Sequence, residues 1–304
     1  MPTVALVLGA GGVTGGAFHA GVVAALAEHR GWDARTADVL VGTSAGSATA
    51  AGLRAGLPPS DMAARARGEA LSDEGAAVLQ AAGVPPGPPP VPGGARVRIG
   101  PPAAPQILFG ALRRPWTVRP TAVAAGLLPA GTVPTDAIVD GMNALHHGAR
   151  WPARPTWVCA VRLRDARLVV FGRDEVTADI GHAVAASCAI PGYFAPVVID
   201  GDRYVDGGAH SLTNVGEVPP DVDLVVVSSP MSRYGPGRVQ LGLEVQRLRR
   251  RRVDVVVFEP TPDVQAAMGV NAMDPSKRRA VVTAALDAAK QRIDDLGGRL
   301  AALG

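Results

Sequence analysis

A serine lies at the centre of a G-x-S-x-G pentapeptide, between Gly42 and Gly46. After the acidic Asp38, residues 39–41 form a short apolar run before it, and small residues follow. The sequence therefore predicts a buried strand, a tight turn and a helix. A sharp turn in this context strains the backbone of the central residue, and the two glycines leave room for it. Ser44 would then be a nucleophile held at a helix N-terminus. The alternative is that Ser44 only caps the helix.

A serine that attacks a carbonyl group needs hydrogen-bond donors for the charge that develops on the carbonyl oxygen. The glycine-rich segment 9–16 directly follows a predicted strand, residues 3–8. It therefore lies at the same edge of a parallel sheet as the serine turn. Because glycine has no side chain, backbone N–H groups in this segment can approach a reacting carbonyl closely. We expect a second donor at the N–H of Ala45, one residue after the serine.

The glycine-rich segment has a competing interpretation as a dinucleotide-binding loop. That fingerprint is G-x-G-x-x-G, and counting from Gly9 the third glycine position is occupied by Thr14. A serine turn in the next strand–helix unit also has no place in a dinucleotide site. The spacing therefore favours an oxyanion-binding segment over a nucleotide site.

The nucleophile also needs a base that takes its proton. Asp206 ends a predicted strand and precedes Gly207 and Gly208, which permit a tight turn. The carboxylate could act as the base if burial raised its pKa, and the alternative is a simple turn aspartate. His210 follows Asp206 by only four positions and is the other candidate. Three more histidines lie between Ser44 and Asp206, none in a recognisable catalytic setting: His146, His147 and His182.

Three blocks in this order resemble the patatin-like phospholipase family, lipid acyl hydrolases that use a Ser-Asp dyad in place of a triad. The first block is the glycine-rich segment 9–15. The second is the serine turn, residues 42–46, in the context DVLVGTSAGS. The third runs over residues 186–208 and ends in D-G-G. Together the blocks bracket roughly the first two thirds of the chain, and their joint presence is more specific than any one of them.

The resemblance implies that Ser44 is the nucleophile and Asp206 its base, with no cofactor and no metal. The oxyanion hole would be formed by the backbone N–H groups around three residues: Gly11, Gly12 and Val13. Two positions depart from the family pattern, since Thr14 replaces a basic residue and Ala10 replaces the first glycine. Backbone donors survive both changes, so we expect catalysis to survive as well.

The elements that must position these residues follow from the hydrophobic pattern. A first strand, the glycine-rich segment, a helix over 17–29, a second strand and a second helix make a βαβα start. This start predicts a three-layer α/β/α fold with a mostly parallel central sheet. A helix capped by Ser60 is predicted over 60–82. The further predicted elements are, in order, a helix over 135–147, a hairpin over 156–171, a helix over 177–188, strands over 197–199, 223–228 and 253–258, and a helix over 276–300.

The 304 residues, 47% of them hydrophobic, are compatible with one large domain or two smaller ones. We expect a single domain over 1–304 with a proline- and glycine-rich insertion at about 84–105, which can form neither helix nor central strand. The following segment, 107–128, predicts either short helices on the core or a lid that faces lipid. The second interpretation depends on apolar residues that lie beside basic ones: Phe109, Leu112 and Trp116 beside Arg113, Arg114 and Arg119.

Composition excludes several classes of function. The net charge is only +3 and no basic patch is interleaved with aromatic residues, so no nucleic-acid partner is predicted. Cys159 and Cys188 lie in apolar surroundings and are expected to be reduced core thiols, and no Cys/His spacing predicts a metal site. The sequence shows neither a signal-peptide pattern nor an apolar run long enough for a membrane span. We therefore expect a cytoplasmic protein, with peripheral contact at a membrane surface left open.

These features predict a serine lipid acyl hydrolase that cleaves carboxylic ester bonds through an acyl-enzyme on Ser44. The expected partner is a lipid or another acyl ester, and the sequence leaves the oligomeric state open. An acyltransferase that uses the same acyl-enzyme is one alternative. A non-catalytic nucleotide-binding protein is the other.

Overall fold

The computed structural model describes residues 2–91, 101–105, 119–147, 151–231 and 235–303, and these contain one eight-stranded sheet. Seven strands follow the order β5-β6-β3-β2-β1-β7-β8, and β4 pairs with β3. The strands are β1 (Val4–Leu8), β2 (Val39–Thr43), β3 (Thr156–Arg162), β4 (Arg167–Phe171), β5 (Val197–Ile199), β6 (Asp202–Asp206), β7 (Leu224–Ser228) and β8 (Asp254–Phe258).

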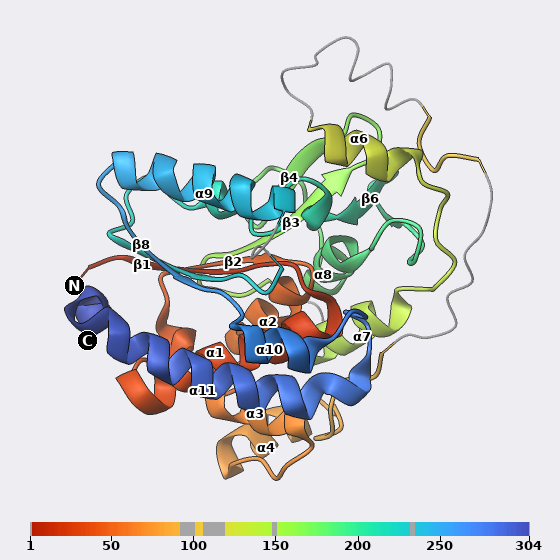
Figure 1. The fold of residues 1–304 in the computed structure, drawn as a ribbon. Helices are drawn as coiled ribbons and strands as arrows, with labels where there is room; N and C mark the ends of the chain where they lie inside the picture. The colour runs from red at the N-terminus through yellow and green to blue at the C-terminus, as the bar shows by residue number, and fades with distance from the viewer. Residues whose placement is uncertain (1, 92–100, 106–118, 148–150, 232–234, 304) are drawn as a thin grey trace.

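Most of the sheet is parallel. The pairs β2–β3, β1–β2, β1–β7 and β7–β8 are parallel, whereas β4 and β6 run antiparallel to β3, and β5 runs antiparallel to β6. This arrangement confirms the predicted α/β class with a mostly parallel sheet. In Figure 1 the parallel strands start near the chain termini on the left and run to the right.

Strand β3 brings the ends of β2 and β6 together. Thr43, the last residue of β2, pairs with Cys159, and Asp206, the last residue of β6, pairs with Ala160. Because β6 runs antiparallel to β3 and β2 runs parallel to it, the two strands end at neighbouring positions. The residue after β2 therefore lies close to the end of β6.

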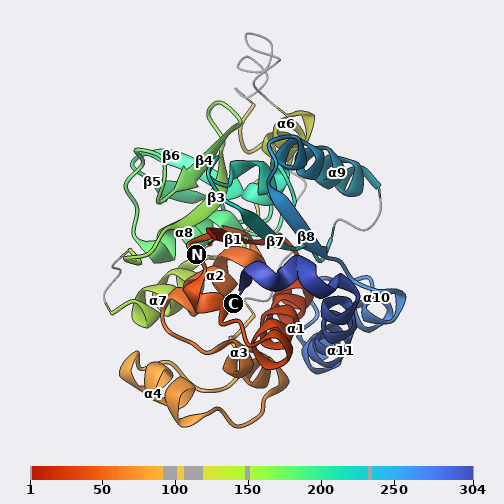
Figure 2. The same cartoon turned by 90° about the vertical axis from the view of Figure 1, so that its left-hand side faces the viewer.

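Helices cover both faces of the sheet (Figures 1 and 2). Leu6 and Leu8 of β1 belong to a core shared with α1 and α11, whereas Ala5 and Val7 belong to a core shared with α9. This alternation follows from the two-residue period of a strand, and both sets are apolar because the strand is buried on both faces. The helices are α1 (Gly12–Arg30), α2 (Ala45–Arg54), α3 (Pro59–Arg67), α4 (Asp73–Ala81), α6 (Pro120–Leu127), α7 (Asp136–Leu145), α8 (Ile180–Cys188), α9 (Gly235–Arg250), α10 (Pro262–Met268) and α11 (Arg278–Leu296).

Two predicted helices were wrong in their extent. The helix predicted over 60–82 is two helices, because Gly68 ends α3 in a left-handed conformation with φ 69° and Ser72 starts α4 by accepting from the Gly75 N–H. Ser60 is not the cap, since α3 begins at Pro59 after Pro58. The helix predicted from residue 17 begins five residues earlier, at Gly12, so residues 12–16 of the glycine-rich segment are helical.

Other predicted elements agree with the structure within a few residues. The hairpin is β3 and β4, and helix α8 starts at Ile180, three residues later than predicted, where Asp179 accepts from the His182 N–H. Residues 85–90 of the insertion are exposed and contain neither helix nor strand. Arg113, Arg114 and Trp116 lie outside the described residues, so the lid interpretation remains a prediction. Among the described residues, no helix combines the length and apolar character that crossing a bilayer requires.

Candidate active site

Ser44 occupies a strained turn between β2 and α2. Its backbone has φ 54° and ψ −125°, a left-handed φ that is rare for a residue other than glycine. The flanking glycines are needed for space, because a Cβ at Gly46 would lie 2.0 Å from the Leu8 carbonyl oxygen and one at Gly42 would lie 2.4 Å from the Ser47 Cα. The backbone is thus held in the geometry that the pentapeptide predicts.

A second serine supports this turn from helix α8. The Ser44 N–H donates to the Ser187 Oγ over 2.8 Å, and the Ser187 hydroxyl donates to the Cys159 carbonyl oxygen over 2.7 Å. Ser187 is fully buried and therefore links the turn to β3 through two hydrogen bonds that water does not reach. Its role depends on a contact across 143 residues, which the sequence pattern did not reveal.

Asp206 lies at the end of β6 beside Ser44, and both side chains are buried, at 5% and 3% exposure. Burial raises the pKa of Asp206 to about 6, although hydrogen bonding from the Ser44 side chain and from the Gly208 N–H opposes this rise. The Gly208 N–H lies 2.7 Å from the carboxylate Oδ1. Gly207 is needed at the turn because a Cβ there would lie 2.2 Å from the Cys159 carbonyl oxygen.

The glycine-rich segment contacts both turns. A Cβ at Gly46 would lie 2.8 Å from the Gly9 carbonyl oxygen, and one at Gly208 would lie 3.3 Å from the Cβ of Ala10. A Cβ at Gly16 would lie 3.9 Å from the Cβ of Ala45. The structure therefore brings all three sequence blocks together at one edge of the sheet.

Backbone donors remain available at the start of α1. Within the described part of the chain, the N–H groups of Gly11, Gly12 and Val13 have no hydrogen-bond partner, whereas the Thr14 N–H donates to the Ala272 carbonyl oxygen over 3.0 Å. The first N–H groups of a helix also carry the positive end of its dipole. The predicted donors can thus stabilise a negative oxygen, as can the Ala45 N–H at the start of α2.

His19 holds the glycine-rich segment in place and was missed by the sequence analysis. Its Nε2 lies 2.7 Å from the Gly9 carbonyl oxygen and its Nδ1 lies 2.7 Å from the Ser228 Oγ. The carbonyl can only accept, so Nε2 carries the proton and Nδ1 accepts from the serine hydroxyl. Burial lowers the pKa of His19 to about 4, so the ring is neutral at physiological pH.

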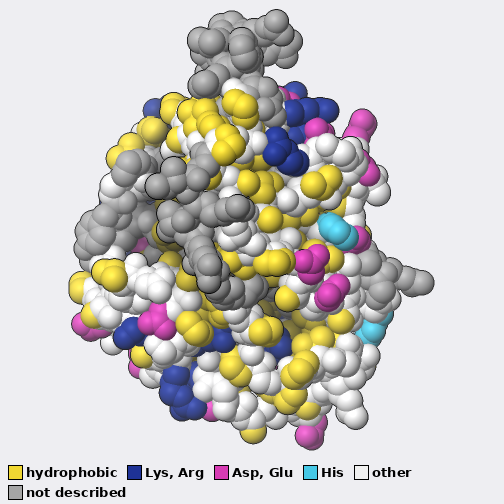
Figure 3. Space-filling model, turned by 90° about the vertical axis from the view of Figure 1, so that its right-hand side faces the viewer, with side chains coloured by type: hydrophobic (Ala, Val, Ile, Leu, Met, Phe, Trp, Pro, Cys, Tyr) yellow, Lys and Arg dark blue, Asp and Glu magenta, His cyan; other side chains and the backbone are white. Residues whose placement is uncertain are grey.

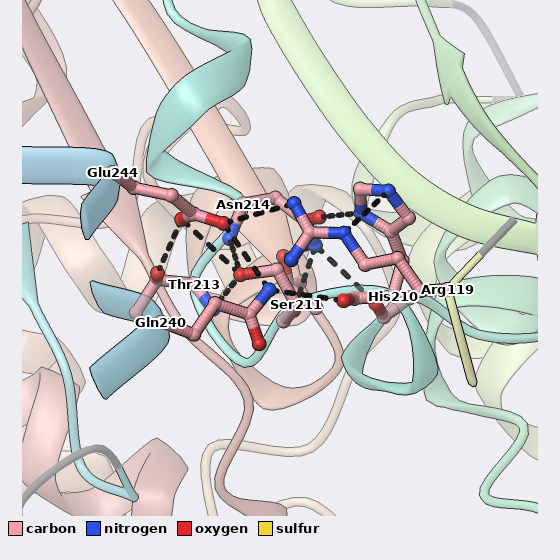
Figure 4. Close-up of polar contacts among 9 residues, drawn as sticks. Arg119, His210, Ser211, Thr213, Asn214, Gln240 and Glu244 are labelled. Carbon is pink, nitrogen blue, oxygen red and sulfur yellow. Dashed lines mark hydrogen bonds and ion pairs between the residues drawn. The ribbon is translucent and has the colours of Figure 1, made fainter. Parts of the chain in front are cut away.

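Asn214 fastens the two turns to each other and was also missed. Its Nδ2 donates to the Thr43 Oγ1 over 3.0 Å and to the Gly207 carbonyl oxygen over 3.3 Å. Thr43 precedes the serine and Gly207 follows the aspartate, so one buried amide contacts the chain on both sides of the pair. Asn214 has a left-handed φ of 50°, which asparagine tolerates better than most residues. Figure 4 shows it between the helix α9 side chains and His210.

The histidine alternative to Asp206 does not fit the structure. The His210 Nδ1 lies 3.0 Å from the Asn214 Oδ1, and its Nε2 accepts from the Arg119 Nε over 3.1 Å. Both ring nitrogens are therefore occupied, and burial lowers the pKa of this histidine. The Nε2 of His146 contacts the Ala51 carbonyl oxygen, and the Nδ1 of His182 contacts the Asp179 carboxylate.

The thiols and the Thr14 hydroxyl complete the surroundings. Both cysteines are free, and Cys159 is buried as predicted, whereas Cys188 is only partly buried. Desolvation of its sulfur atom, together with the Asp206 carboxylate, nevertheless raises the pKa of the Cys188 thiol to about 12, so it is a thiol and not a thiolate. The Thr14 hydroxyl is buried without a hydrogen-bond partner among the described residues. In the same part of the chain, no cluster of His, Cys, Asp and Glu could hold a metal ion.

Comparison with known proteins identifies the family. VipD from Legionella pneumophila has 13% sequence identity and a TM-score of 0.48, and the match covers 97% of this chain and 67% of VipD. The type III effector protein ExoU has 18% identity and a TM-score of 0.42, with 97% of this chain and 53% of ExoU covered. No curated protein sequence matches. The family model described as patatin-like phospholipase matches residues 6–218, well over half of the sequence. The chain therefore belongs to the patatin-like phospholipase family.

Proposed function

We propose that the protein is a serine lipid acyl hydrolase in which Ser44 is the nucleophile and Asp206 the general base. The observation that carries this proposal is the pairing of a serine in a left-handed turn with a buried aspartate whose pKa is raised to about 6. A carboxylate with a raised pKa is a better base and is still ionised at neutral pH. Membership of the family supports a lipid substrate.

In the first half of the reaction, the Asp206 carboxylate accepts the Ser44 hydroxyl proton while Oγ attacks the acyl carbonyl carbon. The carbonyl electrons move to the oxygen, and the N–H groups of Gly11, Gly12, Val13 and Ala45 are the candidate donors to it. When the tetrahedral intermediate collapses, the protonated Asp206 returns its proton to the leaving alcohol. The acyl group is then an ester of Ser44.

In the second half, water enters and Asp206 removes its proton as the water oxygen attacks the acyl-enzyme. The same donors stabilise the second oxyanion, and Ser44 leaves with the proton that Asp206 held. The products are a carboxylic acid and the free enzyme. An acyltransferase would differ only in the acceptor, and product analysis with an added alcohol separates the two reactions.

A fluorophosphonate probe tests the proposal because it reacts only with an activated serine. We expect labelling of the wild-type protein and none of Ser44→Ala or Asp206→Asn. Ser47→Ala is the matched control, since Ser47 lies one turn further along α2 and its hydroxyl is used in a hydrogen bond to the Ser44 carbonyl oxygen. Undiminished labelling of Asp206→Asn would reject Asp206 as the base. An unlabelled wild-type protein would reject the hydrolase and favour the non-catalytic alternative.

A further inference from the structure

A small pocket lies between helix α9 and the segment that follows Asp206. Its volume is about 290 Å³, just below the roughly 300–1,000 Å³ typical of pockets for drug-sized ligands. Three arginines contribute to its lining: Arg119 before helix α6, Arg247 in the last turn of helix α9, and Arg251 directly after that helix. His210, Glu217 and Glu244 also line it. The pocket thus gathers charged groups from segments more than 100 residues apart.

The two carboxylates of this pocket already have partners. Glu244 is buried, and it accepts from the Ser211 Oγ over 3.2 Å, from the Gln240 Nε2 over 3.2 Å and from the Arg119 guanidinium over 3.3 Å (Figure 4). Glu217 pairs with Arg173 over 2.7 Å. Their negative charges are therefore compensated within the protein, so the pocket does not call for a cation.

The two arginines at the C-terminal end of α9 are different. Within the described residues, the side chains of Arg247 and Arg251 have no carboxylate partner and no hydrogen-bond partner, although only four positions separate them. Like charges at this spacing repel each other. A helix C-terminus favours cations in general and would account for any arginine in this run. The helix C-terminus does not explain why Arg247 and Arg251 line the same pocket as Arg119, which comes from a distant segment.

We propose that this pocket binds a phosphate group. Guanidinium groups match phosphate oxygens in geometry and bind them through paired N–H donors. A tetrahedral dianion offers enough acceptor positions for three guanidiniums, whereas a carboxylate offers two oxygens. Arg119 uses Nε and one terminal nitrogen for His210 and Glu244, and its other terminal nitrogen remains for a ligand. The phosphate could belong to a lipid headgroup or to a free phosphate compound.

The pocket is connected to the proposed dyad through two residues that line it. His210 contacts Asn214, and Asn214 donates to Thr43 and to the Gly207 carbonyl oxygen. A ligand held by Arg119 would therefore contact the same hydrogen-bonded chain that fastens the two turns. This proximity is what makes a phosphate-bearing lipid a reasonable source for the bound group.

Binding is measured on the Ser44→Ala protein, so that turnover cannot interfere and the result does not depend on the proposed hydrolysis. The probe is inorganic phosphate in isothermal titration calorimetry, with sodium chloride at equal ionic strength as the reference. The test variant adds Arg247→Gln and Arg251→Gln. The matched control adds Arg250→Gln and Arg252→Gln, which remove the same charge from the same helix end but do not line the pocket. All four side chains are exposed, so both variants should fold.

We expect the test variant to weaken phosphate binding by about tenfold or more and the control to change it less than twofold, because each lost guanidinium removes charge-assisted hydrogen bonds. Absence of phosphate binding in the Ser44→Ala protein would overturn the proposal. Equal weakening in both variants would overturn it too, because binding would then follow net charge alone.

Vesicles distinguish the two sources of phosphate. Co-sedimentation is compared between phosphatidylcholine vesicles and the same vesicles containing phosphatidic acid, whose headgroup is a phosphate monoester. If the pocket takes a headgroup, phosphatidic acid increases sedimentation of the Ser44→Ala protein and of the control, but not of the test variant. If the ligand is a free phosphate compound, both double variants sediment alike while phosphate binding still distinguishes them.

Discussion

In the proposed mechanism Asp206 must be ionised to take the Ser44 proton, and its raised pKa would set the pH at which this happens. With a pKa of about 6, nearly all Asp206 carboxyl groups are ionised above pH 7. Below pH 6 the ionised fraction falls about tenfold for each pH unit. We therefore predict that kcat/KM for a short p-nitrophenyl ester rises with pH and levels off, with a midpoint near 6. A profile that is already flat between pH 4.5 and 8 would contradict this assignment.

The same burial has a cost in stability, because the folded protein holds a charged group out of water. Between pH 4 and 6 the folded state keeps a proton on Asp206 that the unfolded state has lost, so the free energy of unfolding falls as the pH rises. Above pH 6 this loss in the free energy of unfolding has reached its full size, which is on the order of 3 kcal/mol.

Asp206→Asn should therefore be more stable than the wild-type protein at pH 8, and this advantage should shrink toward pH 4. The amide has nearly the shape of the acid but carries no charge into the buried site. Urea unfolding at pH 4.5 and pH 8 measures both differences. A variant that is less stable than the wild type at pH 8 would show that Asp206 is compensated in the folded state by an interaction other than those described.

At the scale of elements, the site depends on strand β2 and the turn η4 (Val215–Glu217) being held together. Thr43 ends β2 and Asn214 precedes η4, and their side chains share a buried hydrogen bond of 3.0 Å. Removing the threonine hydroxyl leaves the Asn214 amide with its two carbonyl partners, so the fold should survive. What is lost is the connection between the serine turn and the aspartate turn.

We predict that Thr43→Val lowers kcat by about tenfold with little change in KM, because a misplaced nucleophile slows the reaction more than it weakens binding. Thr43→Ser keeps the hydroxyl and should restore kcat to within about twofold. Steady-state kinetics well below the melting temperature separates this effect from stability. Equal kcat values for the valine and serine variants would mean that the hydrogen bond is only structural.

The sequence was most informative where a local pattern decides the structure. The apolar runs of β1 and β7 and the alternation in the β3–β4 hairpin could be recognised because a buried strand must be apolar on the faces it buries. Prediction from the sequence was wrong where tertiary contacts override the local preference of the residues. Glycines argue against a helix, yet α1 begins at Gly12, where the Thr14 N–H is satisfied by Ala272 from the far end of the chain.

For the candidate site, the three blocks were found because each carries a motif with its own turn geometry. The residues that hold the blocks together carry no such signal. The hydrogen bonds by which Ser187, His19 and Asn214 hold the blocks together reach partners that lie 7 to 209 positions away. Single polar residues in apolar segments predict burial with a partner, but not which partner. Their roles could only be assigned once the fold was known.

At the scale of the molecule, the family match ends at residue 218, but the structure that supports the site does not. Strand β7 pairs along the whole of β1, and α11 packs against α1 so closely that a Cβ at Gly21 would lie 2.8 Å from the Cβ of Ala285. Anchors of the glycine-rich segment also come from this later part, since the Gly9 N–H donates to the Ser228 carbonyl oxygen. The face of the molecule toward which the parallel strands run carries hydrophobic and charged side chains interspersed (Figure 3).

We predict that a fragment of residues 1–218 does not fold cooperatively and is not labelled by a fluorophosphonate. Without β7, strand β1 becomes an apolar edge that pairs with other chains, and α1 exposes the face that α11 covers. Circular dichroism during heating and size-exclusion chromatography test folding and association. Ser228→Ala in the full chain is the control, because it removes the hydroxyl that His19 contacts but leaves the strand, and it should melt cooperatively. A monomeric 1–218 fragment with a cooperative melt would mean that residues 219–304 are dispensable for the fold. Labelling of that fragment would mean that these residues are dispensable for the active site as well.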